Sequence, residues 1–489
     1  MKVEFEKKEA MIMEKIERAC TSMLIGKDAS ADGSVMIGRN DDTFLPLAPH
    51  RFYMHPAWHN EKGKVLKSWL NGFEMELPEN GYRYNAVPNV DYKKNGYYEE
   101  SGINEKNVAM SATESTYGNC RTLAFDPLVK DGLDEDCMVN ATLPFIDSAR
   151  EAVQYLGKLI QKYGSPAGNS VLFADKNEAW YMEIVTGHLW LAQRIPDDCY
   201  AVVANEVSIQ QVDFSDTDNF QWADGIREFV EEHHLNPDKD GWNFRHIFGT
   251  FNLLDRHYNT PRVWYGHHLF NPEVEEDPQC GELPFLMHPA HKLTHDDMAK
   301  FLSSHYNETS YDPYGKGTEE EKHLYRPIGL NRTQNSHVLQ LRNDVPEELQ
   351  GIMWLSFGFP EFSPYVPFYT NANDTDPSYS NTPLQMDVDA DSAYWMYRHM
   401  SVLVESHYSQ FIQDNTNYLK ECRRVARRKI WQFDQEAAKL HGEELTDFLT
   451  KKNYEMVATM KKMTKDLMNQ LIMKAIQLSK FTFDMDKNL

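Results

Sequence analysis

The pattern of apolar and polar residues divides the chain into a strand-rich part up to about Gly358 and a helical part after Pro383. In the first part, short apolar runs alternate with polar turns, which is typical of β-strands. Residues 21–29 and 34–40 flank Asp32-Gly33, so they predict a β-hairpin. Further strands are predicted at residues 108–113, 337–341 and 352–357. The first part is therefore predicted to contain mostly antiparallel sheet.

Four apolar runs predict an antiparallel meander in the middle of the chain, at residues 171–174, 180–185, 189–195 and 200–205. Just before them, residues 143–163 carry one apolar stripe at helical spacing and are followed by Gly164, which predicts a helix with a glycine cap. Three more helices are predicted at residues 222–233, 242–254 and 294–305. Thr294 and Asp297 would form a capping box for the last of these.

The C-terminal part lacks helix breakers. No proline follows Pro383, and Gly442 is the only glycine after it. Residues 393–480 therefore predict two or three long helices with a break near Gly442. They carry a basic cluster at residues 423–429, which we interpret as a solvated helix face or an arm on the core or at an oligomer interface.

The charge balance narrows the possible partners. The chain has 74 acidic and 50 basic residues, a net charge of −24 that argues against nucleic acid and anionic membranes as partners. No apolar run approaches the roughly 18 residues of a membrane span. Residues 1–19 lack the apolar core of a signal peptide, so we expect a cytoplasmic protein whose six cysteines are reduced. None of the cysteines forms a C-x-x-C pair.

Cys20 is the strongest candidate for chemistry. It stands at the start of the predicted hairpin, and antiparallel pairing would bring Arg39 and Asp42 of the returning strand near it. A cation beside a thiol lowers the thiol pKa and favours the nucleophilic thiolate. The alternative is a small buried cysteine on a strand, a common place for a free thiol.

The residues around this hairpin resemble a known family. Cys20-Thr21, Asp32-Gly33-Ser34 and residues 38–42 (Gly-Arg-Asn-Asp-Asp) are similar to the start of N-terminal-nucleophile hydrolases with a catalytic cysteine. The resemblance is strongest to the C69-type dipeptidases of bacteria, relatives of bile-salt hydrolases and penicillin V acylases. Short motifs extend it to about Tyr369.

This resemblance implies an α+β fold, an αββα sandwich of antiparallel sheets with a long helical C-terminal segment. It also implies a division into a leader (residues 1–19), a catalytic domain (20–383) and a helical extension (384–489). The chain would be cleaved between Ala19 and Cys20, and the freed α-amine would act as general base for the thiol. An α-amine suits this task because its ordinary pKa is near 8. The substrates would be dipeptides, and no cofactor or metal ion is implied.

The resemblance also assigns roles to individual residues. Asp42 would hold the α-amine of Cys20, and Arg39 would lie beside the thiolate. Asn205 would donate to the oxyanion, as a neutral amide can without a counter-charge.

The roles of two further candidate residues follow less directly from the sequence. Glu114 stands where the acylase relatives carry asparagine, and we hypothesise that it binds the α-ammonium group of the substrate. Arg262 would either steady the surroundings of the nucleophile or bind the C-terminal carboxylate of a dipeptide.

Other functions stay open at this point. The same machinery could hydrolyse another small amide, as in choloylglycine hydrolases, or the chain could be a non-enzymatic, secernin-like interaction protein. His288, His291, His295 and Asp296 form a metal-like cluster, but their irregular spacing argues against a metal site. We also expect a homo-oligomer.

Overall fold

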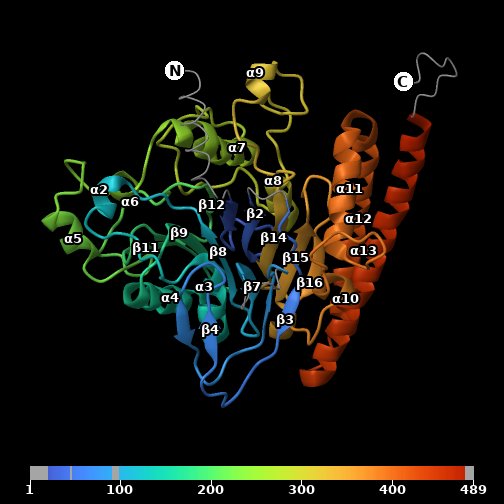
Figure 1. Ribbon diagram of the computed structural model, residues 1–489, viewed down its shortest axis with the longest axis horizontal. Helices are drawn as coiled ribbons and strands as arrows, with labels where there is room; N and C mark the ends of the chain where they lie inside the picture. The colour runs from blue at the N-terminus through green and yellow to red at the C-terminus, as the bar shows by residue number, and fades with distance from the viewer. Residues whose placement is uncertain (1–19, 44–46, 91–97, 479–489) are drawn as a thin grey trace.

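Two six-stranded antiparallel sheets form the centre of the molecule (Figure 1). The computed structural model describes residues 20–43, 47–90 and 98–478, so the predicted leader and its cleavage point lie outside the described residues. The first sheet has the order β12 (Tyr200–Val203), β1 (Thr21–Ile25), β2 (Val35–Asp42), β14 (Thr333–Leu341), β15 (Gly351–Phe357) and β16 (Val366–Tyr369). The second has the order β13 (Phe220–Trp222), β11 (Trp190–Ile195), β10 (Ala179–Ile184), β9 (Asn169–Ala174), β8 (Ala109–Glu114) and β7 (Ser101–Ile103).

The sheets pack face to face, and helices cover their outer sides. β2 contacts β8, β9 and β10 across the interface between the sheets. Helices α3 (Glu135–Thr142) and α4 (Ala149–Tyr163) pack on the second sheet, and α7 (Thr260–Phe270) and α8 (His295–Leu302) pack on the first. Because both faces of each sheet are covered, every residue of β2 and β10 is buried. The predicted αββα sandwich is therefore confirmed.

The C-terminal part consists of three helices, α11 (Ala393–Ser406), α12 (Tyr408–Ala437) and α13 (Gly442–Leu478). Gly442 has a φ of 56°, a left-handed conformation that suits glycine at the predicted break. α11 packs on β15 and α13 on β16, so these helices extend the layer over the first sheet (Figure 1). The Asn453 amide pairs with the backbone N–H and C=O of Tyr369 at 2.9 Å each, which occupies the outer edge of β16.

Several predicted elements differ from the structure. The first strand of the predicted hairpin, residues 21–29, ends at Ile25, so residues 26–34 form a longer connection to β2 than a turn at Asp32-Gly33 would. The fourth strand of the predicted meander, β12, leaves the second sheet and pairs with β1 in the first. Residues 143–163 are not one helix: a 3₁₀ turn, Leu143–Phe145, precedes α4 because Ile146 is extended and Ser148 caps the new N-terminus. The helices predicted from residues 222 and 242 shorten to α5 (Ile226–Glu232), which follows β13, and α6 (Phe244–Phe248), which ends at Gly249.

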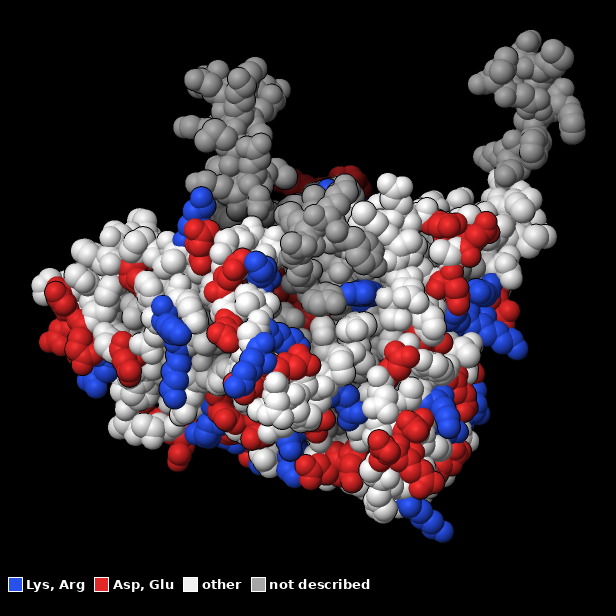
Figure 2. Space-filling model, turned by 60° about the horizontal axis from the view of Figure 1, so that its bottom comes forward, with Lys and Arg blue, Asp and Glu red and all other residues white. Residues whose placement is uncertain are grey.

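The remaining elements are short. They are β3 (Tyr53–His55), β4 (Val65–Lys67), β5 (Glu74–Glu76), β6 (Tyr84–Ala86), α2 (Cys120–Leu123), the π-helical turn η2 (Asp255–Asn259), α9 (Glu319–Lys322), the 3₁₀ turn η3 (Glu347–Leu349) and α10 (Pro377–Ser380). Among the helices of the described residues, none combines the length and the apolar character needed to span a bilayer. Figure 2 shows basic side chains interspersed with acidic ones over the face in view.

Candidate active site

Cys20 lies directly before β1, a central strand of the first sheet, and is only 4% exposed. The hairpin register pairs Ser22 with Arg39, so the Arg39 side chain returns to the level of the thiol. Its Nη1 donates to the Cys20 Sγ at 3.0 Å. The predicted juxtaposition of Arg39 and Cys20 is therefore present in the structure.

The Arg39 guanidinium is held between the two sheets. Nη2 donates to a Glu100 carboxylate oxygen at 2.7 Å, and Nε donates to the Ser111 hydroxyl at 3.0 Å. Both partners belong to the second-sheet side of the interface, and Arg39 is completely buried. No sequence motif pointed to Glu100 or Ser111, because only the packing of the sheets brings them to Arg39.

The surroundings of the Cys20 thiol favour its protonated form. Burial raises the pKa of the thiol to about 12, although the neighbouring Arg39 charge opposes this shift. Among the described residues, Arg39 is the only hydrogen-bond partner of the Sγ, and no histidine bonds to it. The described side chains of the site thus supply a cation for the thiolate but no base to produce it.

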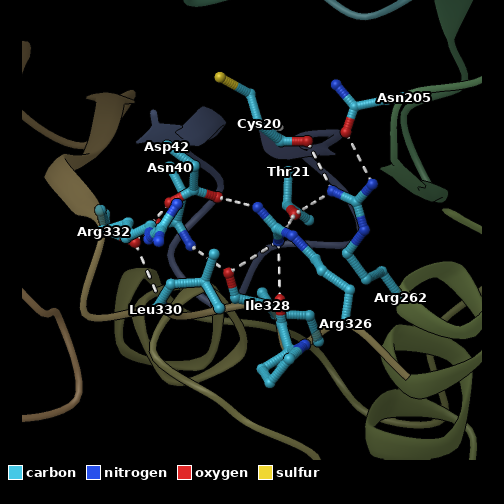
Figure 3. Close-up of polar contacts among 12 residues, drawn as sticks. Cys20, Thr21, Asn40, Asp42, Asn205, Arg262, Arg326, Ile328, Leu330 and Arg332 are labelled. Carbon is cyan, nitrogen blue, oxygen red and sulfur yellow. Dashed lines mark hydrogen bonds and ion pairs between the residues drawn. The ribbon is translucent and has the colours of Figure 1, made fainter. Parts of the chain in front are cut away.

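The Arg262 guanidinium connects the nucleophile segment, Asn205 and the turn before α7 (Figure 3). It projects from the first turn of α7, directly after the π-helical turn η2, a type of distortion that is frequent at functional sites. Its Nη1, Nη2 and Nε groups make five hydrogen bonds of 2.7–2.8 Å, to the Cys20 carbonyl, the Thr21 hydroxyl, the Asn205 side-chain oxygen, the Asn259 side-chain oxygen and the Tyr258 carbonyl.

These bonds use all five donors of the guanidinium. Burial and the nearby Arg326 charge lower the pKa of Arg262 to about 10, which still leaves it charged at neutral pH. Of the two roles predicted for Arg262, the arrangement favours steadying the nucleophile segment over binding a substrate carboxylate.

Asn205 follows β12 and lies beside Arg262, as Figure 3 shows. Because its side-chain oxygen accepts from Arg262, its NH₂ group must point the other way, where it donates to the Glu114 carbonyl at 3.3 Å. The Asn259 amide holds the Asn205 backbone carbonyl at 2.8 Å. The side chain is thus fixed as a donor at the level of Cys20.

Asp42 and Asp41 face opposite sides of β2, as expected for neighbours in a strand. Asp42 accepts from Arg326 Nη2 at 2.6 Å and also bonds the Thr333 hydroxyl. Asp41 instead contacts Asn335 at 2.8 Å. Arg326 lies within the part of the chain over which short motifs extend the family resemblance, but the sequence did not reveal its pairing with Asp42.

Glu114 ends β8 near the same region. Its carbonyl accepts from Asn205, and its backbone N–H bonds to the Glu135 carboxylate. Burial, followed by the charge of Glu114, raises the pKa of the Tyr117 hydroxyl. Glu114 therefore belongs to the surroundings of Cys20, where a substrate-binding carboxylate is predicted.

The histidine cluster considered from the sequence does not converge on one point. His295 stacks on Trp354 with ring centroids 4.0 Å apart, and burial together with the Arg427 charge lowers its pKa to about 4. Asp296 forms an ion pair with Arg427. His288 lies beside Cys199 instead.

The site is thus a buried cysteine thiol between the two antiparallel sheets of an αββα sandwich. Residues 19–421 match the model of the family described as Peptidase family C69. The chain belongs to peptidase family C69.

Curated relatives align along almost the whole chain. A probable dipeptidase from Latilactobacillus sakei is 52% identical over 96% of this chain and 98% of its own length. Probable dipeptidase B from Lactococcus lactis subsp. lactis (strain IL1403) is 40% identical over 95% of this chain and 98% of its own. Dipeptidase A from Lactobacillus helveticus is 36% identical over the same shares, 95% and 98%.

A solved structure, that of a mutant conjugated bile acid hydrolase from Clostridium perfringens, aligns with 76% of this chain and 98% of that chain. Its sequence identity to this chain is 12% and the TM-score is 0.35.

Proposed function

We propose that this chain is a dipeptidase that uses Cys20 as an N-terminal nucleophile, freed by cleavage after Ala19. The observation that carries the proposal is a buried thiol with Arg39 on its sulfur and, among the described residues, no side-chain base bonded to it. A base is needed to ionise such a thiol, and the α-amine of Cys20 itself would be adjacent. Relatives named as dipeptidases support the substrate class.

The proposed reaction proceeds through an acyl-enzyme. The α-amine takes the thiol proton, and the thiolate forms a C–S bond to the peptide carbonyl carbon. The Asn205 NH₂ and a backbone N–H would stabilise the resulting oxyanion. The C–N bond then breaks as the ammonium group returns a proton to the leaving amine. A water molecule, deprotonated by the same amine, attacks the thioester and releases the acid and the thiol.

The surrounding charges fit this sequence of steps. Arg39 would stabilise the thiolate, while Arg262 fixes the Cys20 carbonyl and the Asn205 oxygen. Asp42, held by Arg326, would accept a hydrogen bond from the α-ammonium group. The proposed steps require no cofactor and no metal ion.

The Asn205→Ala variant is expected to lower kcat by about 10²–10³-fold, the typical loss for one oxyanion donor. The loss should appear in kcat rather than KM, because the donor acts on charge that develops in the transition state. Steady-state kinetics with an unblocked dipeptide measure it. The rate of Cys20 alkylation is the control, since a retained thiol reactivity shows that the nucleophile is intact. Wild-type kcat in this variant would remove Asn205 from the mechanism.

The Glu114→Gln variant tests how a dipeptide is recognised. Gln keeps the shape but removes the charge that would pair with the substrate ammonium, a hydrogen bond worth about 1.5–3 kcal/mol. We expect kcat/KM for unblocked dipeptides to fall by roughly 10–100-fold, while N-acetyl dipeptides change little. Glu443→Gln, at the exposed start of α13, is the matched control. An unchanged preference for free N-termini would contradict the proposed role.

A substrate panel separates the proposed function from its alternatives. We expect turnover of unblocked dipeptides and little turnover of glycine-conjugated bile acids, penicillin V or acyl-homoserine lactones. The opposite preference would favour an acylase. Turnover of none of these compounds by the processed protein would favour a secernin-like interaction protein. The cytoplasmic location and the homo-oligomer stay predictions.

A further inference from the structure

A second cysteine lies at the far end of the strand that leads to Asn205. Cys199 directly precedes β12, and Asn205 follows it, so at about 3.3 Å per residue the two lie roughly 20 Å apart. The Cys199 Sγ is 3.6 Å from His288 Nδ1 and 3.7 Å from an Asp198 carboxylate oxygen. The imidazole Nδ1 is in turn 3.4 Å from the other oxygen of Asp198.

These three groups are of the types that bind zinc. Bonds of about 2.3 Å to sulfur and about 2.0–2.2 Å to nitrogen or oxygen place tetrahedral ligands roughly 3.4–3.6 Å apart. The separation of 3.6 Å between the Cys199 Sγ and the His288 Nδ1 matches such an edge. One Asp198 oxygen lies 3.7 Å from the sulfur and the other 3.4 Å from the Nδ1, and one donor atom from each residue lies within 4.8 Å of the other two. The geometry points to a Zn²⁺ site made by these three side chains, with a water molecule as the fourth ligand.

Backbone hydrogen bonds hold together the two segments that carry these three residues before any ion binds. Cys199 C=O accepts from the Gly26 N–H at 2.9 Å. On the other segment, Met287 and Tyr200 exchange backbone hydrogen bonds of 3.0 and 2.8 Å, which sets His288 next to the turn. Such pre-organisation lowers the cost of assembling a metal site.

The charged side chains around Asp198 do not oppose the binding of a cation. Lys27 and Arg194 both pair with Asp197, and among the described residues Asp198 has only His288 as an ion-pair partner. The His288 and Asp198 side chains are 72% and 65% exposed, so an ion can reach them from solvent. Within the described ranges, no other group of three such side chains converges in this way.

An ion at this position would tie the turn between β11 and β12 to the segment that precedes α8. It lies at the opposite end of β12 from the proposed catalytic thiol, so it takes no part in peptide hydrolysis. The site is therefore independent of the proposed dipeptidase function. Its expected effect is stabilisation of the folded protein, because an ion that binds only the folded state raises the melting temperature.

Titration with CoCl₂ under reducing conditions tests the site, because Co²⁺ adopts zinc-like coordination and reports it spectroscopically. We expect one equivalent to bind with a thiolate-to-cobalt charge-transfer band, and ZnCl₂ to abolish the band. Cys199→Ser should remove the band, and His288→Ala should weaken binding at least tenfold. His288→Ala is informative on its own, because this exposed side chain contributes little to the core.

Cys120→Ser and Cys20→Ser are the controls for the other thiols. Both should keep the band, and ZnCl₂ should raise the Tm of wild type but not of His288→Ala. The proposal is overturned if wild type shows no charge-transfer band, or if Cys199→Ser binds Co²⁺ with the same affinity and spectrum.

Discussion

The Cys20→Ala variant is expected to show no measurable hydrolysis of unblocked dipeptides. Loss of the nucleophile of a hydrolase costs on the order of 10⁶ in kcat, because no other group can form the acyl-enzyme. We also expect the thiol itself to carry out the cleavage after Ala19, so in this variant residues 1–19 would stay attached and no α-amine would be freed. Initial rates with a dipeptide and the intact mass of the variant measure both effects.

The matched control is Cys120→Ala, which removes an exposed cysteine at the start of α2. It should hydrolyse dipeptides at the wild-type rate. Dipeptide turnover by Cys20→Ala at the wild-type rate would mean that the chemistry takes place elsewhere in the molecule.

Arg39→Met is expected to reduce both activity and stability. The substitution removes the Arg39 cation from its buried ion pair with the Glu100 carboxylate, 2.7 Å away in the wild type. Breaking a buried ion pair from one side typically costs about 3–5 kcal/mol. It also removes the cation that lowers the pKa of the Cys20 thiol. With a higher thiol pKa, the α-amine takes the thiol proton less readily, so kcat/KM for dipeptides should fall at every pH measured.

The double variant Arg39→Met/Glu100→Gln separates these two effects. It removes both charges, so urea unfolding should show that most of the lost stability returns. The kcat/KM for dipeptides should stay low, at least 100-fold below wild type, because the thiolate still lacks its cation. Recovery of activity together with stability would show that Arg39 has only a structural role.

The sequence could predict the part of the site that depends on local pairing. Two apolar runs close together in the chain predicted that β1 and β2 pair as a hairpin, which brings Arg39 towards Cys20. The register itself was not predicted, because a two-residue Asp32-Gly33 turn would place Ser22 opposite residue 43, whereas the connection spans residues 26–34 and Ser22 lies opposite Arg39. The partners of Arg39 were not predictable in this way. Ser111 lies on β8 of the second sheet and Glu100 directly precedes β7, and no local pattern indicates which residues meet across a sheet interface.

The errors in the predicted fold have the same origin. The apolar run of β12 is a strand in either sheet, and only the pairing with β1 decides which sheet it joins. The break before α4 depends on Ser148, whose hydroxyl accepts from the Glu151 N–H, a cap inside a continuous apolar stripe. Local periodicity thus predicted most of the helices and strands, whereas the pairing between them could be seen only in the tertiary structure.

The most direct test of the central claim is the intact mass of the purified wild-type protein, with and without a thiol-directed alkylating reagent. We predict the mass of residues 20–489, with one rapid adduct that maps to Cys20. A full-length mass with an unreactive Cys20 in a protein that still hydrolyses dipeptides would contradict the N-terminal-nucleophile mechanism. The same mass in a protein without activity would favour the interaction-protein alternative.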